Sequence, residues 1–370
     1  MNQRVALLLL VALQGCNPVL EPIFERKATP LTGAPNAARV IWTVDTSGSM
    51  DLPIDPSTPE CPSGCGIAGN LCPAACPTRK TELATAFERF QTELPAEVTQ
   101  SVVFFPTGAL ACGGENRIVH DLSSADLLLR VRAIAPTGGT PTTAALNFVA
   151  AVEPLPHTET FVVLITDGPP NCNANNPHNV CADFNDVAAL QACQCTTGTC
   201  RAEVICSIGC LDELGPVSAS HLLVEKEQKL MAVGFGPDIS SGIGPAFLSS
   251  MELTVGPECT SSADCVGGTA CGADGICVEK RMMAMTAADF QKPAEVLARA
   301  VKKSQRCTWW LPRQVTAAEL TVRVGGAAIP TEQWKLVGTT EQRVVISGAA
   351  CDALLVGTEA PSIEWLPPAE

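Results

Sequence analysis

The chain has 370 residues, which is long for one compact domain and allows up to two. Hydrophobic residues make up 46% of it, enough for a substantial core, while 29 glycines and 29 prolines indicate many turns and irregular segments. A formal net charge of −14 makes nucleic acid and anionic membrane surfaces poor partners, because like charges repel each other.

The first 16 residues have the pattern of a lipoprotein signal peptide. Arg4 precedes an apolar run from Val5 to Leu13, which is too short to span a bilayer and indicates secretion. Leu13-Gln14-Gly15-Cys16 resembles the bacterial lipobox, so Cys16 is the predicted lipidation site and the predicted membrane anchor. The alternative is ordinary cleavage nearby, with Cys16 incidental. Residues 17–38 are rich in Pro and Ala without periodicity and are predicted to form a tether.

The first core strand is predicted at Val40–Val44, a short β-branched and apolar run. It is followed by Asp45-Thr46-Ser47-Gly48-Ser49, in which a carboxylate and two hydroxyls occupy alternate positions. Gly48 lets the backbone bend so that these three oxygens turn toward one point. Oxygen ligands suit a hard divalent cation such as Mg²⁺ rather than zinc. Taken alone, this DxSxS pattern also matches many surface turns.

Helices and strands then alternate, which predicts an α/β fold with a parallel sheet. From Cys307 onward, apolar and polar residues alternate between glycine turns, so residues 306–370 are predicted to be a small antiparallel β module. Helices are predicted at 78–94, 124–134, 142–152, 218–229 and 287–301, and further core strands at 100–105, 117–122, 161–166 and 229–235.

The 19 cysteines point to an oxidising compartment, and lipidation of Cys16 leaves 18, an even number that can all pair. They gather in insertions at 51–77, 169–215 and 256–280, and the pair Cys307 and Cys351 is predicted to tie the terminal module together. In the first insertion CxxxC units could bind zinc, and in the second a CQC motif with His178 could bind a metal, but secretion favours disulfides in both. The second insertion holds seven cysteines, so Cys112 is the natural partner for the odd one. The disulfide candidates are Cys61, Cys65, Cys72, Cys76, Cys112, Cys172, Cys181, Cys193, Cys195, Cys200, Cys206, Cys210, Cys259, Cys265, Cys271, Cys277, Cys307 and Cys351.

Two later stretches add weight to the metal site. Residues 136–142, PTGGTPT, form a glycine turn that leads into a helix and offers Thr140, and the strand at 161–166 ends in Asp167-Gly168. This order of motifs over residues 39–305 resembles the von Willebrand factor A (integrin I-like) domain and its metal-ion-dependent adhesion site. The resemblance implies a Rossmann-like, doubly wound and mostly parallel sheet. It also implies Mg²⁺, Mn²⁺ or Ca²⁺ as the cation, and an acidic residue of a partner protein as the group that completes its coordination. The implied metal ligands are Asp45, Ser47, Ser49, Thr140 and Asp167.

The function that this resemblance implies is metal-dependent adhesion to a protein or an extracellular surface. Together with the lipobox, it predicts a lipoprotein of the bacterial outer membrane, periplasmic or surface-exposed. The whole layout also resembles the myxobacterial adventurous gliding-motility lipoproteins, which are surface adhesins. One alternative is a disulfide-stapled envelope scaffold with a structural metal. A metal-dependent hydrolase is disfavoured because the site stretches contain no His and the sequence contains no GxSxG, HExxH or P-loop motif. The chain is therefore predicted not to be an enzyme.

Overall fold

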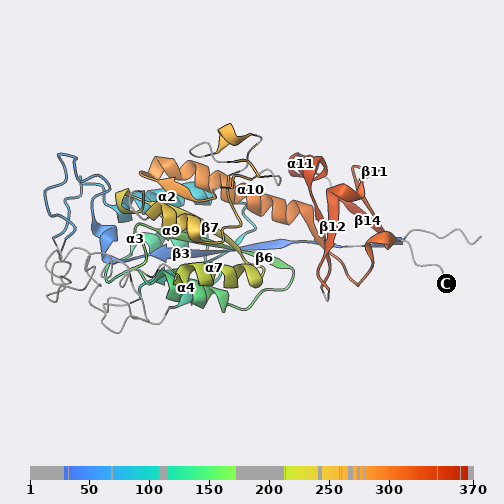
Figure 1. Cartoon of the computed structure of the whole chain (residues 1–370), viewed down its shortest axis with the longest axis horizontal. Helices are drawn as coiled ribbons and strands as arrows, with labels where there is room; N and C mark the ends of the chain where they lie inside the picture. The colour runs from blue at the N-terminus through green and yellow to red at the C-terminus, as the bar shows by residue number, and fades with distance from the viewer. Residues whose placement is uncertain are drawn as a thin grey trace, which may run out of the picture.

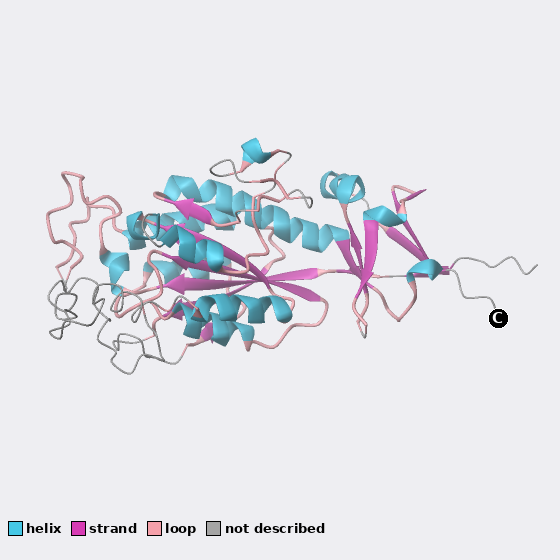
Figure 2. Cartoon of the chain, viewed as in Figure 1, coloured by secondary structure: helices cyan, strands magenta, loops and turns pink. Residues whose placement is uncertain are grey.

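A computed structural model of the protein describes residues 29–31, 33–67, 70–107, 116–171, 212, 214–240, 244–257, 259, 261–265, 270–272, 276–278, 280–339, 341–358 and 360–365. An α/β part with one central sheet occupies most of the molecule, and a smaller β module lies at one end (Figures 1 and 2). The predictions for lipidation at Cys16 and for metal binding at His178 lie outside the described residues. So do the disulfide predictions for Cys112, Cys172, Cys181, Cys193, Cys195, Cys200, Cys206 and Cys210.

The central sheet has six strands in the order β5-β4-β3-β6-β7-β8. All neighbours pair in parallel except the edge strand β5, which is antiparallel to β4. The doubly wound, mostly parallel sheet is therefore confirmed. β3 and β6 are buried along most of their length because helices cover both faces of the sheet. The strands are β3 (Ala37–Asp45), β4 (Thr99–Phe105), β5 (Ile118–Val119), β6 (Thr158–Thr166), β7 (Lys229–Phe235) and β8 (Met282–Ala284).

Successive residues of β3 enter two separate cores, as strand geometry requires. Trp42 lies in the core beneath α2 (Arg79–Glu93), α3 (Ser124–Arg132) and α10 (Gln291–Cys307). Ile41 lies in the core above α4 (Thr142–Ala150), α7 (Gly215–Glu225) and α9 (Gly244–Ser250). Figure 1 shows α2 and α10 on one side of the sheet and α4 and α7 on the other. Short helical turns join these elements: η1 (Gly48–Asp51), α8 (Pro237–Ser240), η2 (Ser262–Asp264) and η4 (Ala287–Phe290).

Two helix predictions were wrong at their ends. The helix predicted over 218–229 is α7, which ends at Glu225 because Glu227 takes a left-handed φ of 56° that no helix can continue through. The last helix, predicted to end at 301, continues to Cys307, since neither Gly nor Pro interrupts its apolar spacing.

The terminal module contains two four-stranded sheets, β1-β14-β10-β11 and β12-β13-β9-β2, in which every pair is antiparallel. This confirms the predicted β module, but the tether predicted for 17–38 is wrong from residue 29 onward, since β1 and β2 belong to these sheets. A helix, α11, was also not predicted. The elements are β1 (Thr29–Leu31), β2 (Ala34–Pro35), β9 (Thr308–Trp310), η5 (Ala317–Glu319), β10 (Leu320–Val324), β11 (Ala327–Ala328), η6 (Thr331–Gln333), β12 (Trp334–Val337), β13 (Arg343–Ile346), α11 (Gly348–Val356) and β14 (Ser362–Trp365).

Specific contacts join the module to the α/β part. α10 runs directly into β9, so the last helix of one part is continuous with the module. Asn36 lies between the two parts: its amide donates to Ser304 Oγ of α10 at 2.6 Å and accepts from Trp310 Nε1 of β9 at 2.8 Å. The ring of His157 stacks on Trp310 with 5.1 Å between centroids. These contacts fix the module at the end of the sheet where β3 begins.

Ten of the predicted disulfide candidates form five disulfides among the described residues. Cys61–Cys76 and Cys65–Cys72 staple the first insertion, and Cys259–Cys271 and Cys265–Cys277 staple the third. Cys307–Cys351 joins the end of α10 to α11, as predicted for the module. None of the helices in the described ranges combines the length and apolarity that crossing a bilayer requires.

Candidate metal site

Two buried carboxylates meet at the carboxyl edge of the central sheet. Asp45 is the last residue of β3, and Asp167 follows the last residue of β6, the neighbouring parallel strand. Their exposed fractions are 1% and 0%. Asp45 Oδ1 accepts from Ser47 N at 2.8 Å, and its Oδ2 accepts from Thr166 Oγ1 at 2.7 Å. The strand pairing that the sequence predicts thus brings both acids to one place, and backbone and hydroxyl donors orient them.

The two serine hydroxyls connect these acids. Ser47 Oγ and Ser49 Oγ lie 2.9 Å apart, and Ser49 Oγ donates to Asp167 Oδ1 at 2.9 Å. The short turn η1, which follows Ser47, directs both side chains toward the sheet edge. Four of the five predicted ligands therefore form one continuous cluster of oxygen atoms.

Thr140 lies on an adjoining loop. Gly48 N donates to Gly138 O at 3.0 Å and Thr137 N to Thr46 O at 2.9 Å, so this loop is attached to the one that carries the serines. Thr140 is buried, with 2% exposed, and its backbone N donates to Asn171 Oδ1 at 2.6 Å. Within the described residues its hydroxyl forms no hydrogen bond with the other four predicted ligands. The five residues thus share one edge, and their role as metal ligands stays a prediction.

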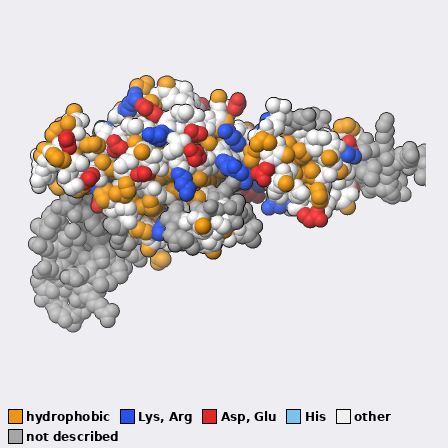
Figure 3. Space-filling view, turned by 90° about the horizontal axis from the view of Figure 1, so that it is seen from above, with side chains coloured by type: hydrophobic (Ala, Val, Ile, Leu, Met, Phe, Trp, Pro, Cys, Tyr) orange, Lys and Arg blue, Asp and Glu red, His pale blue; other side chains and the backbone are white. Residues whose placement is uncertain are grey.

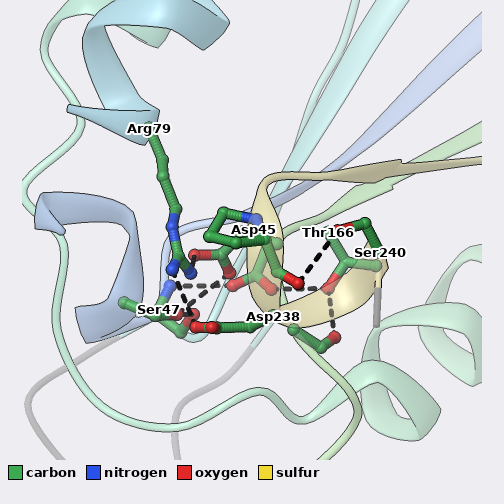
Figure 4. Close-up of polar contacts among 10 residues, drawn as sticks. Asp45, Ser47, Arg79, Thr166, Asp238 and Ser240 are labelled. Atoms are coloured by element: carbon green, nitrogen blue, oxygen red, sulfur yellow. Dashed lines mark hydrogen bonds and ion pairs between the residues drawn. The ribbon is translucent and has the colours of Figure 1, made fainter. Parts of the chain in front are cut away.

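Two charged residues at the site were missed by the sequence analysis. Arg79, the first residue of α2, donates from Nη1 to Asp167 Oδ2 at 2.8 Å and from Nη2 to Asp238 Oδ2 at 2.7 Å. Figure 4 shows the Arg79 side chain reaching from its helix toward Asp45, Ser47 and Asp238. Asp238 follows β7, so the strand-end reasoning that found Asp45 and Asp167 could have found it too. Nothing in the local sequence marked Arg79.

Burial governs the protonation of the two carboxylates. It raises the pKa of Asp45 to about 8, and the nearby charge of Asp167 acts in the same direction, while hydrogen bonds from Ser47 and Thr166 oppose it. Burial also raises the pKa of Asp167, against the opposing charge and hydrogen bond of Arg79 and the hydrogen bond from Ser49. The metal-free site therefore holds a proton on Asp45 near neutral pH.

Metal binding is consequently expected to depend on pH. A cation must displace the proton from Asp45, so the apparent affinity for Mg²⁺ should rise by roughly tenfold per pH unit below the Asp45 pKa of about 8 and level off above it. Calorimetric titration at several pH values measures this, and a flat profile would contradict it.

The stability of the metal-free fold is expected to change with pH in the opposite direction. Because the folded pKa is raised, the contribution of Asp45 to stability is fully present below about pH 4 and is lost as the pH rises through about 8. Asp45→Asn should remove this slope in thermal melts.

The donor set fits a hard divalent cation, because every side chain of the predicted ligand set offers oxygen. In the part of the chain that the structure describes, two groups of cysteines also lie close enough together to hold a metal ion. They are Cys65 with Cys72 and Cys76, and Cys259 with Cys265 and Cys277. Their sulfurs lie in disulfides, so these groups do not fit zinc and the zinc reading of the first insertion is not supported.

The described chain has a mostly parallel sheet with helices on both faces, as the resemblance to a von Willebrand factor A domain implied, and the predicted aspartate, serine and threonine positions lie at the carboxyl edge of that sheet. No protein-family model and no curated protein matches the chain. Solved structures similar to it include a von Willebrand factor type A protein from Catenulispora acidiphila, at 14% identity and a TM-score of 0.37, covering 91% of this chain and 59% of that one. The von Willebrand factor domain of the type V pili tip protein Mfa5 from Porphyromonas gingivalis has 12% identity and a TM-score of 0.38, with 76% and 99% coverage. Manganese-loaded TRAP from Plasmodium vivax has 11% identity and a TM-score of 0.35, with 73% and 78% coverage. Similarity at this level does not show a function for this chain.

Proposed function

We propose that this protein is a metal-dependent binding protein of the bacterial envelope, which takes an acidic side chain of a partner protein or surface onto a divalent cation. The cation, Mg²⁺ or alternatively Mn²⁺ or Ca²⁺, would be held by Asp45, Ser47, Ser49, Thr140 and Asp167. The observation that carries the proposal is the cluster of two buried carboxylates and two hydroxyls linked at one sheet edge. Neutral hydroxyl ligands leave a cation short of negative charge, so that it still attracts a carboxylate from outside.

Binding rather than catalysis is proposed because the described site offers no histidine as a general base. His157 stacks on Trp310 at the module, beside the start of β6 and so at the opposite end of the strands from the metal edge. His221 pairs with Glu252 at the surface, and both side chains are substantially exposed. The remaining alternatives are a disulfide-stapled scaffold with a structural metal and, less favoured, a metal-dependent hydrolase.

The geometry supports presentation of the site away from an N-terminal anchor. The first described strands, β1 and β2, belong to the terminal module, while β3 runs from the module toward the metal edge (Figure 1). A lipid on Cys16 would hold the module toward an outer membrane and leave the metal edge facing outward. An adhesin of the gliding-motility type is the narrower form of this proposal.

Surface charge also favours an acidic protein ligand recognised by a metal over a nucleic acid recognised by charge. On the face seen in Figure 3, Lys and Arg side chains lie beside Asp and Glu over the α/β part. This face therefore lacks the continuous basic surface that nucleic acid binding requires, in keeping with the net charge of −14.

Attachment of the protein to a polyglutamate surface tests the proposal. Because the protein carries a charge of −14, non-specific electrostatics oppose its binding to an acidic polymer and favour polylysine. We expect beads coated with residues 17–370 to attach to a polyglutamate surface in Mg²⁺, to detach in EDTA, and not to attach when they carry Asp45→Asn. Equal attachment in Mg²⁺ and EDTA, or equal attachment by Asp45→Asn, would argue against a metal-bridged carboxylate.

A further inference from the structure

Arg79 occupies a position that would be unfavourable for a cation without the two neighbouring carboxylates. It begins α2, where the helix dipole disfavours positive charge, and 3% of its side chain is exposed, so the guanidinium has lost most of its hydration. Its two ion pairs, to Asp167 at 2.8 Å and to Asp238 at 2.7 Å, supply the compensation.

The surrounding chain holds Arg79 in place. Its backbone N donates to Leu52 O at 3.0 Å, which closes the base of the first insertion just beyond the Cys61–Cys76 disulfide. Thr78 caps the helix and accepts from Thr81 N. Gly236 lies against the side chain: a Cβ there would come within 3.3 Å of Arg79 Nε, and its φ of 94° suits glycine. These backbone and packing contacts therefore hold the Arg79 side chain in place.

The two oxygens of Asp167 serve different partners. Oδ1 accepts from Ser49 and faces the predicted ligand cluster, while Oδ2 accepts from Arg79. The Asp167 carboxylate therefore lies between the positive charge of Arg79 and the proposed cation. This positive charge offsets buried negative charge in the metal-free site, and it repels a divalent cation when one binds.

We propose, on the basis of the metal site proposed above, that Arg79 is a resident counter-cation that keeps the metal-free domain folded and holds its metal affinity down. The domain can then release and rebind metal without unfolding. Asp238, with half of its side chain exposed, is the outer partner that positions the guanidinium.

Arg79→Met tests this because it keeps much of the side-chain length and removes the charge. We expect its melting temperature in EDTA to fall by on the order of 10 °C, because an unpaired buried carboxylate remains. We expect its Mg²⁺ affinity, measured by calorimetry, to be roughly 10- to 100-fold tighter, since the repulsion is gone. Saturating Mg²⁺ should then restore most of the lost melting temperature. Arg132→Met is the matched control, since Arg132 pairs with Glu88 at the surface with 54% of its side chain exposed, and it should change neither quantity.

Asp238→Asn gives a second test that does not remove the buried charge. It leaves Arg79 less compensated, so Mg²⁺ binding should weaken severalfold, opposite in direction to Arg79→Met. Equal or weaker Mg²⁺ binding by Arg79→Met, or the same loss of melting temperature with and without Mg²⁺, would mean that Arg79 has only a structural role. If the parent itself binds no Mg²⁺ that Asp45→Asn removes, the proposed function fails together with this inference. If the parent binds and Arg79→Met binds no more tightly, only this inference fails.

Discussion

Replacing both Asp45 and Ser47 by alanine is expected to reduce Mg²⁺ binding by at least about a hundredfold, below detection in a calorimetric titration. The double variant removes one carboxylate and one hydroxyl from the cluster, and each good contact of a charged group in such a site contributes about 1.5–3 kcal/mol. It also leaves Thr166 Oγ1 without its Asp45 acceptor, so folding must be verified by circular dichroism and a thermal melt. The parent should bind Mg²⁺ at millimolar concentration or below.

The chain supplies a matched control for this experiment. Asp55-Pro56-Ser57 repeats the DxS spacing, and Ser57 donates to Asp55 Oδ1 from its backbone N at 2.8 Å and from Oγ at 2.6 Å. This turn is exposed and therefore represents the common surface version of the motif. Alanine at both Asp55 and Ser57 should leave Mg²⁺ binding unchanged. Equal Mg²⁺ binding by the parent and by the Asp45 and Ser47 double variant would identify DxSxS as a structural turn here and favour the scaffold alternative.

The elements that could be predicted from the sequence are those whose partners impose a regular pattern. β7 was predicted to the residue because both of its faces are covered and its apolar run is unbroken. β1 and β2 could not be predicted, since they have three and two residues, each contains a proline, and their partners β14 and β9 lie far along the chain. Both lie at sheet edges, where proline is tolerated because it need not donate to a neighbouring strand.

The residues of the candidate site also divide into those that could be predicted from local sequence and those that could not. The five predicted ligands come from motifs that could be read locally. Asp45 and Asp167 meet because parallel neighbours end together, and backbone hydrogen bonds between two loops bring Thr140 to the same edge. The ion pairs of Arg79 join residues 88 and 159 positions apart, so they depend on which strands become neighbours and on where the stapled insertion returns the chain. Local patterns carry no information on either point.

Trp42→Ala is expected to lower the stability of the protein by about 3–5 kcal/mol, because it removes the largest side chain of the core beneath α2. The indole is fully buried, and its ring centroid lies 4.9 Å from those of both Phe87 and Phe90. It therefore joins the central strand to the helix that begins with Arg79. For a protein of this size the melting temperature should fall by roughly 6 to 20 °C.

Two controls separate packing from hydrogen bonding. Trp42 Nε1 donates to Gln100 Oε1 at 2.9 Å, and that oxygen also accepts from Gln91 Nε2 at 2.9 Å. Trp42→Phe keeps an aromatic ring and leaves Gln100 with a partner, so it should lose less than half as much stability as Trp42→Ala. Leu129→Ala, at a side chain with 63% exposed, should change the melting temperature by only about 1–2 °C. If Trp42→Ala melted within that range as well, the contacts between β3 and α2 would not be what stabilises the sheet.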